Sequence, residues 1–455
     1  AIIAFVSWFL YKCYIYPSYL SPLRKIPGPP VGNLILGHTS FKKQDYGKAF
    51  SQLAKQYGGI VRYHFLLNKP YLVITDPKLV QKILASYDFP RSYINSAMMK
   101  DLVGEGGLVV ANDDTHKRQR KMLSPSFSFG NVKEMLPTFI QAAHNLKAIW
   151  MKEIGNKREE RITITTTTSK IALDIIGLVG KALSNLLPFI RKIPTPNNNK
   201  YYESIKTINN ISEKLIADKK NCPVQGTDLL SLLIKANDQS PVDEQLTHSE
   251  LVGQVMTLLI SGHETTSVTI SFALYFLAAN PDIQDRLRKE ILAILPDRDC
   301  HPTADQIEQL KFLECVFKEV LRIVPPGSVI LRTNVKDETF NGYFIPKKTP
   351  LLIPISSIHH DPSVWGHDAE HFNPYRWLNP EIKSNITNFN FIPFSAGPRS
   401  CLAMRMTNLE IRTILAVIIR NLEFKLVEGF TFEKTHGITV KPYPGIDLLV
   451  SIVDR

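Results

Sequence analysis

The chain has 455 residues, of which 44% are hydrophobic, and this is enough to bury a large core. Its formal net charge is +12, but the basic residues are scattered without a recognition motif or an interleaved aromatic platform, which argues against nucleic-acid binding. Five cysteines without paired spacing argue against a disulfide framework and for a reducing compartment.

The chain begins with an apolar stretch, residues 1–11, that is too short to span a bilayer and has no initiator methionine. Lys12, Arg24 and Lys25 then add positive charge. We therefore expect residues 1–20 to be a truncated N-terminal membrane anchor. A secretory signal is the alternative, but it would need a small-residue cleavage site and would expose the rest of the chain to oxidation.

A proline-rich stretch at 26–30 is too stiff for a helix or a central strand, so we expect residues 21–30 to form a hinge. Length alone would allow about three domains, but no Gly/Ser-rich linker or repeat divides the remaining chain. We therefore predict one large domain over residues 31–455. Its fold is expected to be mainly α with a small β-rich subdomain, built from segments at 60–75, 327–333, 343–354 and the carboxyl end.

Small basic clusters could form one basic face, or they could belong to an ordinary solvated surface. The residues concerned are Lys117, Arg118, Arg120, Lys121, Arg405 and Arg412.

A long buried helix is predicted in the middle of the chain. The sequence Thr247-His248-Ser249-Glu250 is a capping box, and the stretch that follows is apolar nearly all round until Asn280-Pro281 ends it. Its roughly 30 residues would extend over about 45 Å.

A polar island, residues 261–266, interrupts this helix, and a buried polar cluster costs free energy unless it is hydrogen-bonded or functional. His263 could begin a zinc-protease H-E-x-x-H motif, but Ser267 stands where the second histidine is required. Thr265 and Thr266 could instead donate hydrogen bonds to the preceding turn and bend the helix.

A second helix is predicted from Leu310 to Val324, where apolar residues recur at three and four before Pro325-Pro326 ends the pattern. Glu319 and Arg322 lie one turn apart on it. Taken alone, they would be a solvent-exposed pair that contributes a few tenths of a kcal/mol.

The segment from Phe394 to Ala403 delivers one thiol, Cys401, to the start of an apolar helix. The unpaired N–H groups and positive end of a helix favour the thiolate, which is the form that binds a metal. A single soft ligand suits haem iron, because zinc or an iron–sulfur cluster would need several Cys or His side chains together.

This segment resembles the haem-binding peptide of the cytochromes P450, whose pattern F-x-x-G-x-R-x-C-x-G is matched at Phe394, Gly397, Arg399 and Cys401. Ala403 stands where glycine is usual, which should still permit close packing. The resemblance implies that the Cys401 thiolate coordinates the iron of haem b, and that Phe394 and Gly397 help to form the pocket.

The resemblance assigns roles to the helices as well. The polar island is similar to the family's A/G-G-x-D/E-T motif, with Ser261 in place of the usual small apolar residue. Glu264 and Thr265 would then relay protons to dioxygen. Cations for the haem propionates would be Arg120, Arg332 and Arg399, with His116 in a position where tryptophan is common.

Glu319 and Arg322 resemble the family's E-x-x-R motif, and Arg376 follows in an F-x-P-x-R-W setting. The resemblance implies that these three residues form a buried charge network that fixes the loop carrying Cys401. Their role would be structural.

The implied function is haem-dependent monooxygenation of a hydrophobic small molecule, with electrons from NADPH through a reductase. Cytochrome b5 is a further implied partner, and basic residues would dock the acidic reductase. An anchor of the microsomal type would place the enzyme on the endoplasmic reticulum membrane with the catalytic domain facing the cytosol.

One region does not fit the resemblance. Residues 171–180 pass directly into 181–190, where the family usually has a further loop and most of another helix above the substrate. We therefore predict an internal deletion near residues 176–190, either natural or from an error in the gene model. Two alternatives remain open: a haem-thiolate peroxide isomerase or dehydratase, and a catalytically impaired haem or lipid binder.

Overall fold

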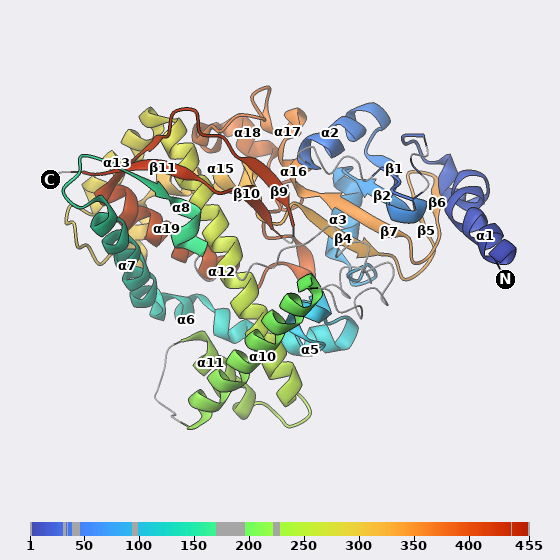
Figure 1. The fold of residues 1–455 in the computed structure, drawn as a ribbon, viewed down its shortest axis with the longest axis horizontal. Coiled ribbons are helices and arrows are strands. Elements are labelled where there is room, and N and C mark those ends of the chain that lie inside the picture. Colours follow the sequence, from blue (N-terminus) through green and yellow to red (C-terminus); the bar gives the residue numbers. More distant parts are fainter. Residues whose placement is uncertain are drawn as a thin grey trace. The chain divides into compact units, whose positions relative to one another are not determined.

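The computed structural model describes residues 2–30, 33, 35–38, 46–92, 99–169, 196–221, 228–437 and 439–453. The chain forms two compact units, which we describe separately. Unit 1 consists of residues 1–93, 321–401 and 434–440, and unit 2 consists of residues 94–320, 402–433 and 441–455. The predicted fold class, mainly α with a small β-rich part, is confirmed (Figure 1). The predicted deletion near residues 176–190 lies outside the described residues.

Unit 1 is built around a four-stranded sheet in the order β1-β2-β7-β4. β1 and β2 are antiparallel, β2 and β7 are parallel, and β7 and β4 are antiparallel. All of β7 is buried, as its apolar sequence requires, and the predicted strand segments are confirmed. The strands are β1 (Ile60–His64), β2 (Pro70–Ile74), β4 (Val329–Thr333) and β7 (Pro350–Pro354), with a separate pair, β5 (Glu338–Phe340) and β6 (Tyr343–Ile345).

Short helices complete unit 1. The first turn of α3 (Pro77–Ala85) is well defined, because the Asp76 carboxylate accepts hydrogen bonds from two backbone N–H groups and Pro77 occupies the first helical position. The other helices are α2 (Tyr46–Tyr57), α16 (Ile355–His359), α17 (Pro362–Trp365), η7 (Pro374–Leu378), α18 (Pro380–Asn385) and η8 (Gly397–Arg399).

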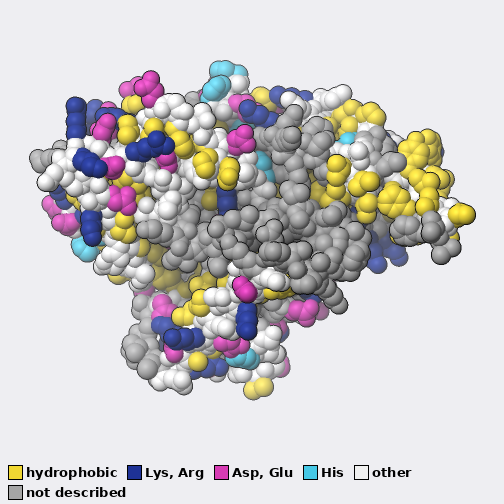
Figure 2. Space-filling model, in the orientation of Figure 1, with side chains coloured by type: hydrophobic (Ala, Val, Ile, Leu, Met, Phe, Trp, Pro, Cys, Tyr) yellow, Lys and Arg dark blue, Asp and Glu magenta, His cyan; other side chains and the backbone are white. Residues whose placement is uncertain are grey.

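The N-terminal segment of unit 1 is helical, as α1 (Ile2–Leu10) and η1 (Tyr11–Leu20), followed by η2 (Pro22–Lys25). One side of it is buried at Cys13 and Pro17, and the Asn68 amide donates to the Cys13 carbonyl over 2.7 Å. The other side is rich in exposed apolar and aromatic side chains, which gather at the α1 end of Figure 2. Among the described helices, none is both long and apolar enough to cross a bilayer.

Unit 2 is mainly helical, and α12 (His248–Ala279) is its longest element, coloured yellow-green in Figure 1. The predicted capping box of Thr247 and Glu250 is confirmed, as is the end of the helix at Asn280. α12 packs against α8, α10, α13 and α19, and α19 also packs along α7. The predicted burial of α12 is confirmed for most of its length.

The remaining helices of unit 2 are α5 (Asp113–Leu123), η5 (Ser124–Phe127), α6 (Phe129–Glu134), α7 (Leu136–Ile154), α8 (Ile164–Ser169), α10 (Pro196–Asn221), α11 (Leu229–Gln239), α13 (Pro281–Ile294), α14 (Ala304–Gln309) and α19 (Met404–Asn421). Its sheet has the order β3-β11-β8, from β3 (Glu160–Thr163), β11 (Asp447–Ile452) and β8 (Leu422–Leu426). The chain passes from one unit to the other at several points, and three of these points lie within an element: β9 (Glu433–His436), β10 (Val440–Tyr443) and α15 (Lys311–Ile323).

The predicted helix that carries Glu319 and Arg322 is confirmed as α15, and its start is capped by a side chain from another helix. The Glu290 carboxylate of α13 accepts hydrogen bonds from the backbone N–H groups of Phe312 (2.7 Å) and Leu313 (3.0 Å). Two donors that lack an intrahelical partner are thereby satisfied, and the negative charge lies at the positive end of the helix.

Glu290→Ala is expected to lower the free energy of unfolding by about 1–2 kcal/mol, since both N–H groups lose their acceptor. Glu290→Gln keeps one carbonyl oxygen and should cost less. Urea unfolding of the three proteins measures the difference. Equal midpoints for Glu290→Ala and the unchanged chain would contradict the assigned capping role.

Candidate active site

The turn that carries Cys401 lies in unit 1 and has a tightly constrained backbone. Gly397 has a φ of +70°, and a Cβ at this position would lie 2.1 Å from the carbonyl oxygen of Leu84. Glycine is therefore required both by the backbone conformation and by the close contact. The backbone N–H of Cys401 donates to the carbonyl of Phe394 over 2.8 Å and closes the turn. Cys401 itself is exposed. The next helix, α19, begins at Met404, three residues after Cys401.

Buried arginines gather in unit 1. Arg332 on β4 is 5% exposed and Arg399 on η8 is 4% exposed. Burial, followed by the charges of Arg91 and Arg399, lowers the pKa of Arg332 to about 9. In the part of the chain that the structure describes, no carboxylate forms an ion pair with Arg332.

A cluster of buried cations is stabilised by an anion, because negative charge offsets both the desolvation of each guanidinium and their mutual repulsion. The two carboxylates of a haem fit this requirement. The structure therefore brings together two of the predicted propionate residues, Arg332 and Arg399, and adds Arg91, which the sequence analysis missed because no motif marks it.

Arg322 and Arg376, both predicted to fix the Cys401 loop, are fully buried in unit 1 and bind the same segment of backbone. Arg322 donates to the carbonyls of His359 (2.7 Å), Ala369 (2.6 Å) and His371 (3.1 Å). Arg376 donates to the carbonyl of His371 as well, over 3.4 Å. These two arginines therefore share a structural target, residues 359–371.

Arg376 also has a partner that the sequence analysis missed, the carboxylate of Asp368, at 2.7 Å. Burial alone would raise the pKa of Asp368, but hydrogen bonds from Arg376 and Asn373 outweigh it and lower the pKa to about 2. Glu319, the third member of the predicted network, is completely buried on α15 and belongs to unit 2.

The polar island of α12 lies in unit 2 and contains both candidate proton-relay residues. The Thr265 hydroxyl donates to the carbonyl of Ser261 over 2.7 Å, which is the bond to the preceding turn that we considered as an alternative. The carboxylate of Glu264 forms an ion pair with Lys441 of β10. Thr265 remains partly accessible, so this bond and a role in proton transfer are compatible.

Thr266, the next residue, is buried and hydrogen-bonded to Glu410 of α19. Burial raises the pKa of Glu410 to about 7, and the bond with Thr266 acts in the opposite direction. Sequence analysis missed Glu410, because a single glutamate on an apolar helix does not reveal what it faces.

Glu410 should make the stability of the protein depend on pH. Between the pKa of an unfolded glutamate, about 4.3, and about 7, the folded protein binds a proton that the unfolded chain has released, so stability falls as the pH rises through this window. Part of the residue reaches solvent, so we expect a fall of about 2 kcal/mol rather than the full value of about 4 kcal/mol that the pKa difference gives.

Glu410→Gln cannot titrate and should remove this fall while keeping an acceptor for Thr266. Denaturant unfolding of both proteins between pH 4.5 and pH 8 provides the measurement. Parallel stability profiles for the two proteins would contradict the raised pKa.

His116 and Arg120 lie one turn apart on α5 in unit 2, with His116 completely buried and Arg120 half-buried. Both residues therefore lie on one face of α5, which agrees with the prediction that both reach one ligand.

Of the two alternatives for the basic clusters, the contacts favour an ordinary solvated surface over one basic face. Three of its members on α5 are neutralised by carboxylates: Lys117 pairs with Asp114, Arg118 with Glu250 and Lys121 with Glu244. Arg412 is 1% exposed and donates to Glu308, Asn408 and the carbonyl of Ile307. Arg412 is therefore held inside the fold and Arg118 is partly buried, whereas Lys117, Lys121 and Arg405 are exposed.

Comparisons with known proteins agree with these features. The family model "Cytochrome P450" matches residues 22–180 and 179–449. The chain is 28% identical to cytochrome P450 monooxygenase sphH of Aspergillus fumigatus, over 97% of this chain and 90% of that protein. It is 27% identical to cytochrome P450 monooxygenase ptmK of Penicillium ochrochloron (95% and 96%), and 28% identical to cytochrome P450 3A29 of Sus scrofa (90% and 88%).

The two matched segments together cover nearly the whole chain, including the Cys401 turn, the polar island of α12 and both buried arginine groups. The chain therefore belongs to the cytochrome P450 family and is a haem-dependent monooxygenase.

Proposed function

We propose that Cys401 is the thiolate ligand of haem b in this monooxygenase. The observation that carries the proposal is the turn from Phe394 to Cys401, closed by a backbone hydrogen bond and held by Gly397, which presents an exposed thiol. The other cysteines that the structure describes, Cys13, Cys300 and Cys315, are buried. Bound haem would supply the dioxygen chemistry, and the thiolate is the ligand suited to O–O cleavage.

Arg332 and Arg399 are proposed to hold the propionates, together with Arg120 and His116 of α5. The buried arginine group of unit 1, with the lowered pKa of Arg332, supports this assignment. The proton relay is assigned to the Glu264 carboxylate and the Thr265 hydroxyl, which are adjacent on α12. Release of Glu264 from Lys441 would allow its carboxylate to accept a proton from solvent. The carboxyl group would then donate this proton to the Thr265 hydroxyl as the hydroxyl donates its own proton onward.

NADPH is proposed as the electron source, through a reductase, with cytochrome b5 as a second donor. A hydrophobic small molecule is proposed as the substrate. Location on the endoplasmic reticulum membrane, with the catalytic domain facing the cytosol, is supported by the exposed apolar side of α1 and η1. A metabolite screen with the reductase present would identify the substrate.

A second function, a haem or lipid binder without turnover, is favoured by one observation. The two matches to the family model meet at residues 179–180, within the predicted deletion. This break in the family match supports a shortened substrate region.

The test is incubation of the haem-loaded protein with reductase, NADPH and a panel of fatty acids, sterols and xenobiotics, with products followed by mass. A product heavier by one oxygen atom supports the monooxygenase of this proposal. Conversion of a lipid hydroperoxide without NADPH would favour the isomerase or dehydratase. A normal haem spectrum with no product on any substrate would favour the binder. Sequencing the transcript across residues 176–190 tests the deletion itself.

A further inference from the structure

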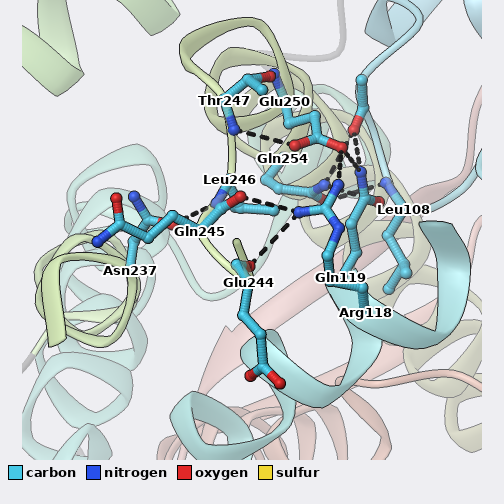
Figure 3. Close-up of polar contacts among 11 residues, drawn as sticks. Leu108, Arg118, Gln119, Asn237, Glu244, Gln245, Leu246, Thr247, Glu250 and Gln254 are labelled. Atoms are coloured by element: carbon cyan, nitrogen blue, oxygen red, sulfur yellow. Dashed lines mark hydrogen bonds and ion pairs between the residues drawn. The ribbon is translucent and has the colours of Figure 1, made fainter. Parts of the chain in front are cut away.

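Four polar side chains of unit 2 join the start of α12 to α5 and to the segment 104–108. They are Arg118 and Gln119 of α5 and Glu250 and Gln254 of α12, and Figure 3 shows them pointing toward one another. We call this group the α5–α12 junction. Gln119 and Gln254 are only 1% and 2% exposed, so their hydrogen bonds are formed away from bulk water.

Glycines allow the backbone of segment 104–108 to touch α12 directly. A Cβ at Gly106 would lie 2.5 Å from the Cα of Glu250, and a Cβ at Gly253 would lie 2.5 Å from the backbone nitrogen of Gly107. No larger residue fits at either position without moving the backbone. The segment and the first turns of α12 are therefore in fixed register.

The two buried glutamines cross-link this contact. Gln254 accepts from the N–H of Leu108 (3.0 Å) and donates to the carbonyl of Gly106 (3.1 Å) and to Gln119 (3.1 Å). Gln119 donates to the carbonyl of Gly106 (2.9 Å) and to Glu250 (3.0 Å). Both N–H donors of each amide are used, and such a fully satisfied buried network specifies one geometry.

Glu250 connects the network to the helix start. One carboxylate oxygen accepts from the N–H of Thr247 over 2.9 Å in the capping box, and the other accepts from Arg118 and Gln119. Arg118 also donates to the carbonyl of Gln245 over 2.9 Å. Burial alone would raise the pKa of Glu250, but these hydrogen bonds lower it. α12 therefore cannot unwind or shift at its start without breaking bonds to α5.

The junction also sets the rotation of α5 about its axis. Its bonds are made by residues 118 and 119, whereas His116 and Arg120, four residues apart, share a neighbouring face. At 100° per residue, a rotation that broke the bonds of Arg118 and Gln119 would turn His116 and Arg120 by the same angle.

We propose that the α5–α12 junction is a positioning device for the cofactor: it holds α5 so that Arg120 and His116 face the haem propionates, in fixed register with the helix that carries Glu264 and Thr265. The inference rests on the proposed function of Arg120. Arg118, Gln119, Glu250 and Gln254 are positioning residues that do not contact the cofactor.

Glu250→Gln is the sharpest test, because glutamine at this position still completes the capping box while it removes the charge that binds Arg118. Haem transfer from the haem-loaded protein to apomyoglobin should become about tenfold faster, and amide hydrogen exchange of residues 113–123 should accelerate. Glu244→Gln is the matched control, because it removes an exposed carboxylate that pairs with Lys121 of the same helix and leaves the junction intact. This control should transfer haem at the unchanged rate.

A double-mutant cycle with Arg120→Gln separates positioning from general stability. If the junction acts through Arg120, Glu250→Gln adds nothing to haem loss in the Arg120→Gln background. Additive effects, or no effect of either single substitution on haem loss, would overturn the inference. Should Glu250→Gln fail to fold, Gln254→Glu takes its place in the same cycle. The red-shifted carbon monoxide band of each variant reports thiolate ligation, so failure of the haem-thiolate proposal is seen separately.

Discussion

Replacing Cys401 with alanine is expected to abolish the strongly red-shifted Soret band of the reduced carbon monoxide complex, together with monooxygenase activity. The thiolate is the only proposed ligand from the chain, and electron donation by sulfur is what shifts the band and favours O–O cleavage. The turn should survive the substitution, because its closing hydrogen bond uses the backbone N–H of residue 401 and its shape depends on Gly397.

Cys300→Ala is the matched control for this experiment. Cys300 is buried, and burial raises the pKa of its thiol, which disfavours the thiolate form. The control should therefore keep both the band and the activity. A Cys401→Ala protein that retained the red-shifted band would refute the haem-thiolate assignment.

Arg376→Ala is expected to lower the free energy of unfolding by about 3–5 kcal/mol, the range for removing one partner of a buried ion pair. The substitution leaves the carboxylate of Asp368 without its cation and removes the guanidinium from the carbonyls of Trp365, Asp368 and His371. A domain stabilised by about 5–15 kcal/mol would lose much of its margin.

Denaturant unfolding, combined with the yield of haem-loaded protein, measures this loss. Arg405→Ala is the matched control, because Arg405 is an exposed arginine on the helix that follows Cys401. We expect it to unfold within about 0.5 kcal/mol of the unchanged chain. Equal stability of Arg376→Ala and Arg405→Ala would mean that the buried arginine does not support the fold.

Features encoded in neighbouring residues could be predicted from the sequence. The capping box at Thr247, the proline that ends α12 and the glycine turn before Cys401 each act over a few residues, so their effect on the backbone is local. The same is true of the apolar strand β7, whose continuous burial follows from its composition.

Contacts between distant segments could not be predicted in this way. Lys441 pairs with Glu264, and Glu410 bonds to Thr266, although the partners lie far apart in the chain. The choice between the two alternatives for the basic cluster on α5 could not be made from the sequence for a related reason, since a count of charges does not show that Glu250 neutralises Arg118. Which charged side chains come into contact is decided by how the helices and strands pack.

The contacts of Arg322 have a consequence for which substitutions the chain can accept. Its guanidinium is bonded to the main-chain oxygens of His359, Ala369 and His371, and every amino acid carries such an oxygen. Residue 371 should therefore exchange freely among side-chain types, provided that the backbone path is kept, since its side chain is exposed. The arginine, by contrast, should be nearly irreplaceable. Sequence variability and structural importance are thus separated at this contact: Arg322 is constrained, whereas residue 371, which it binds only through the main chain, is free to diverge.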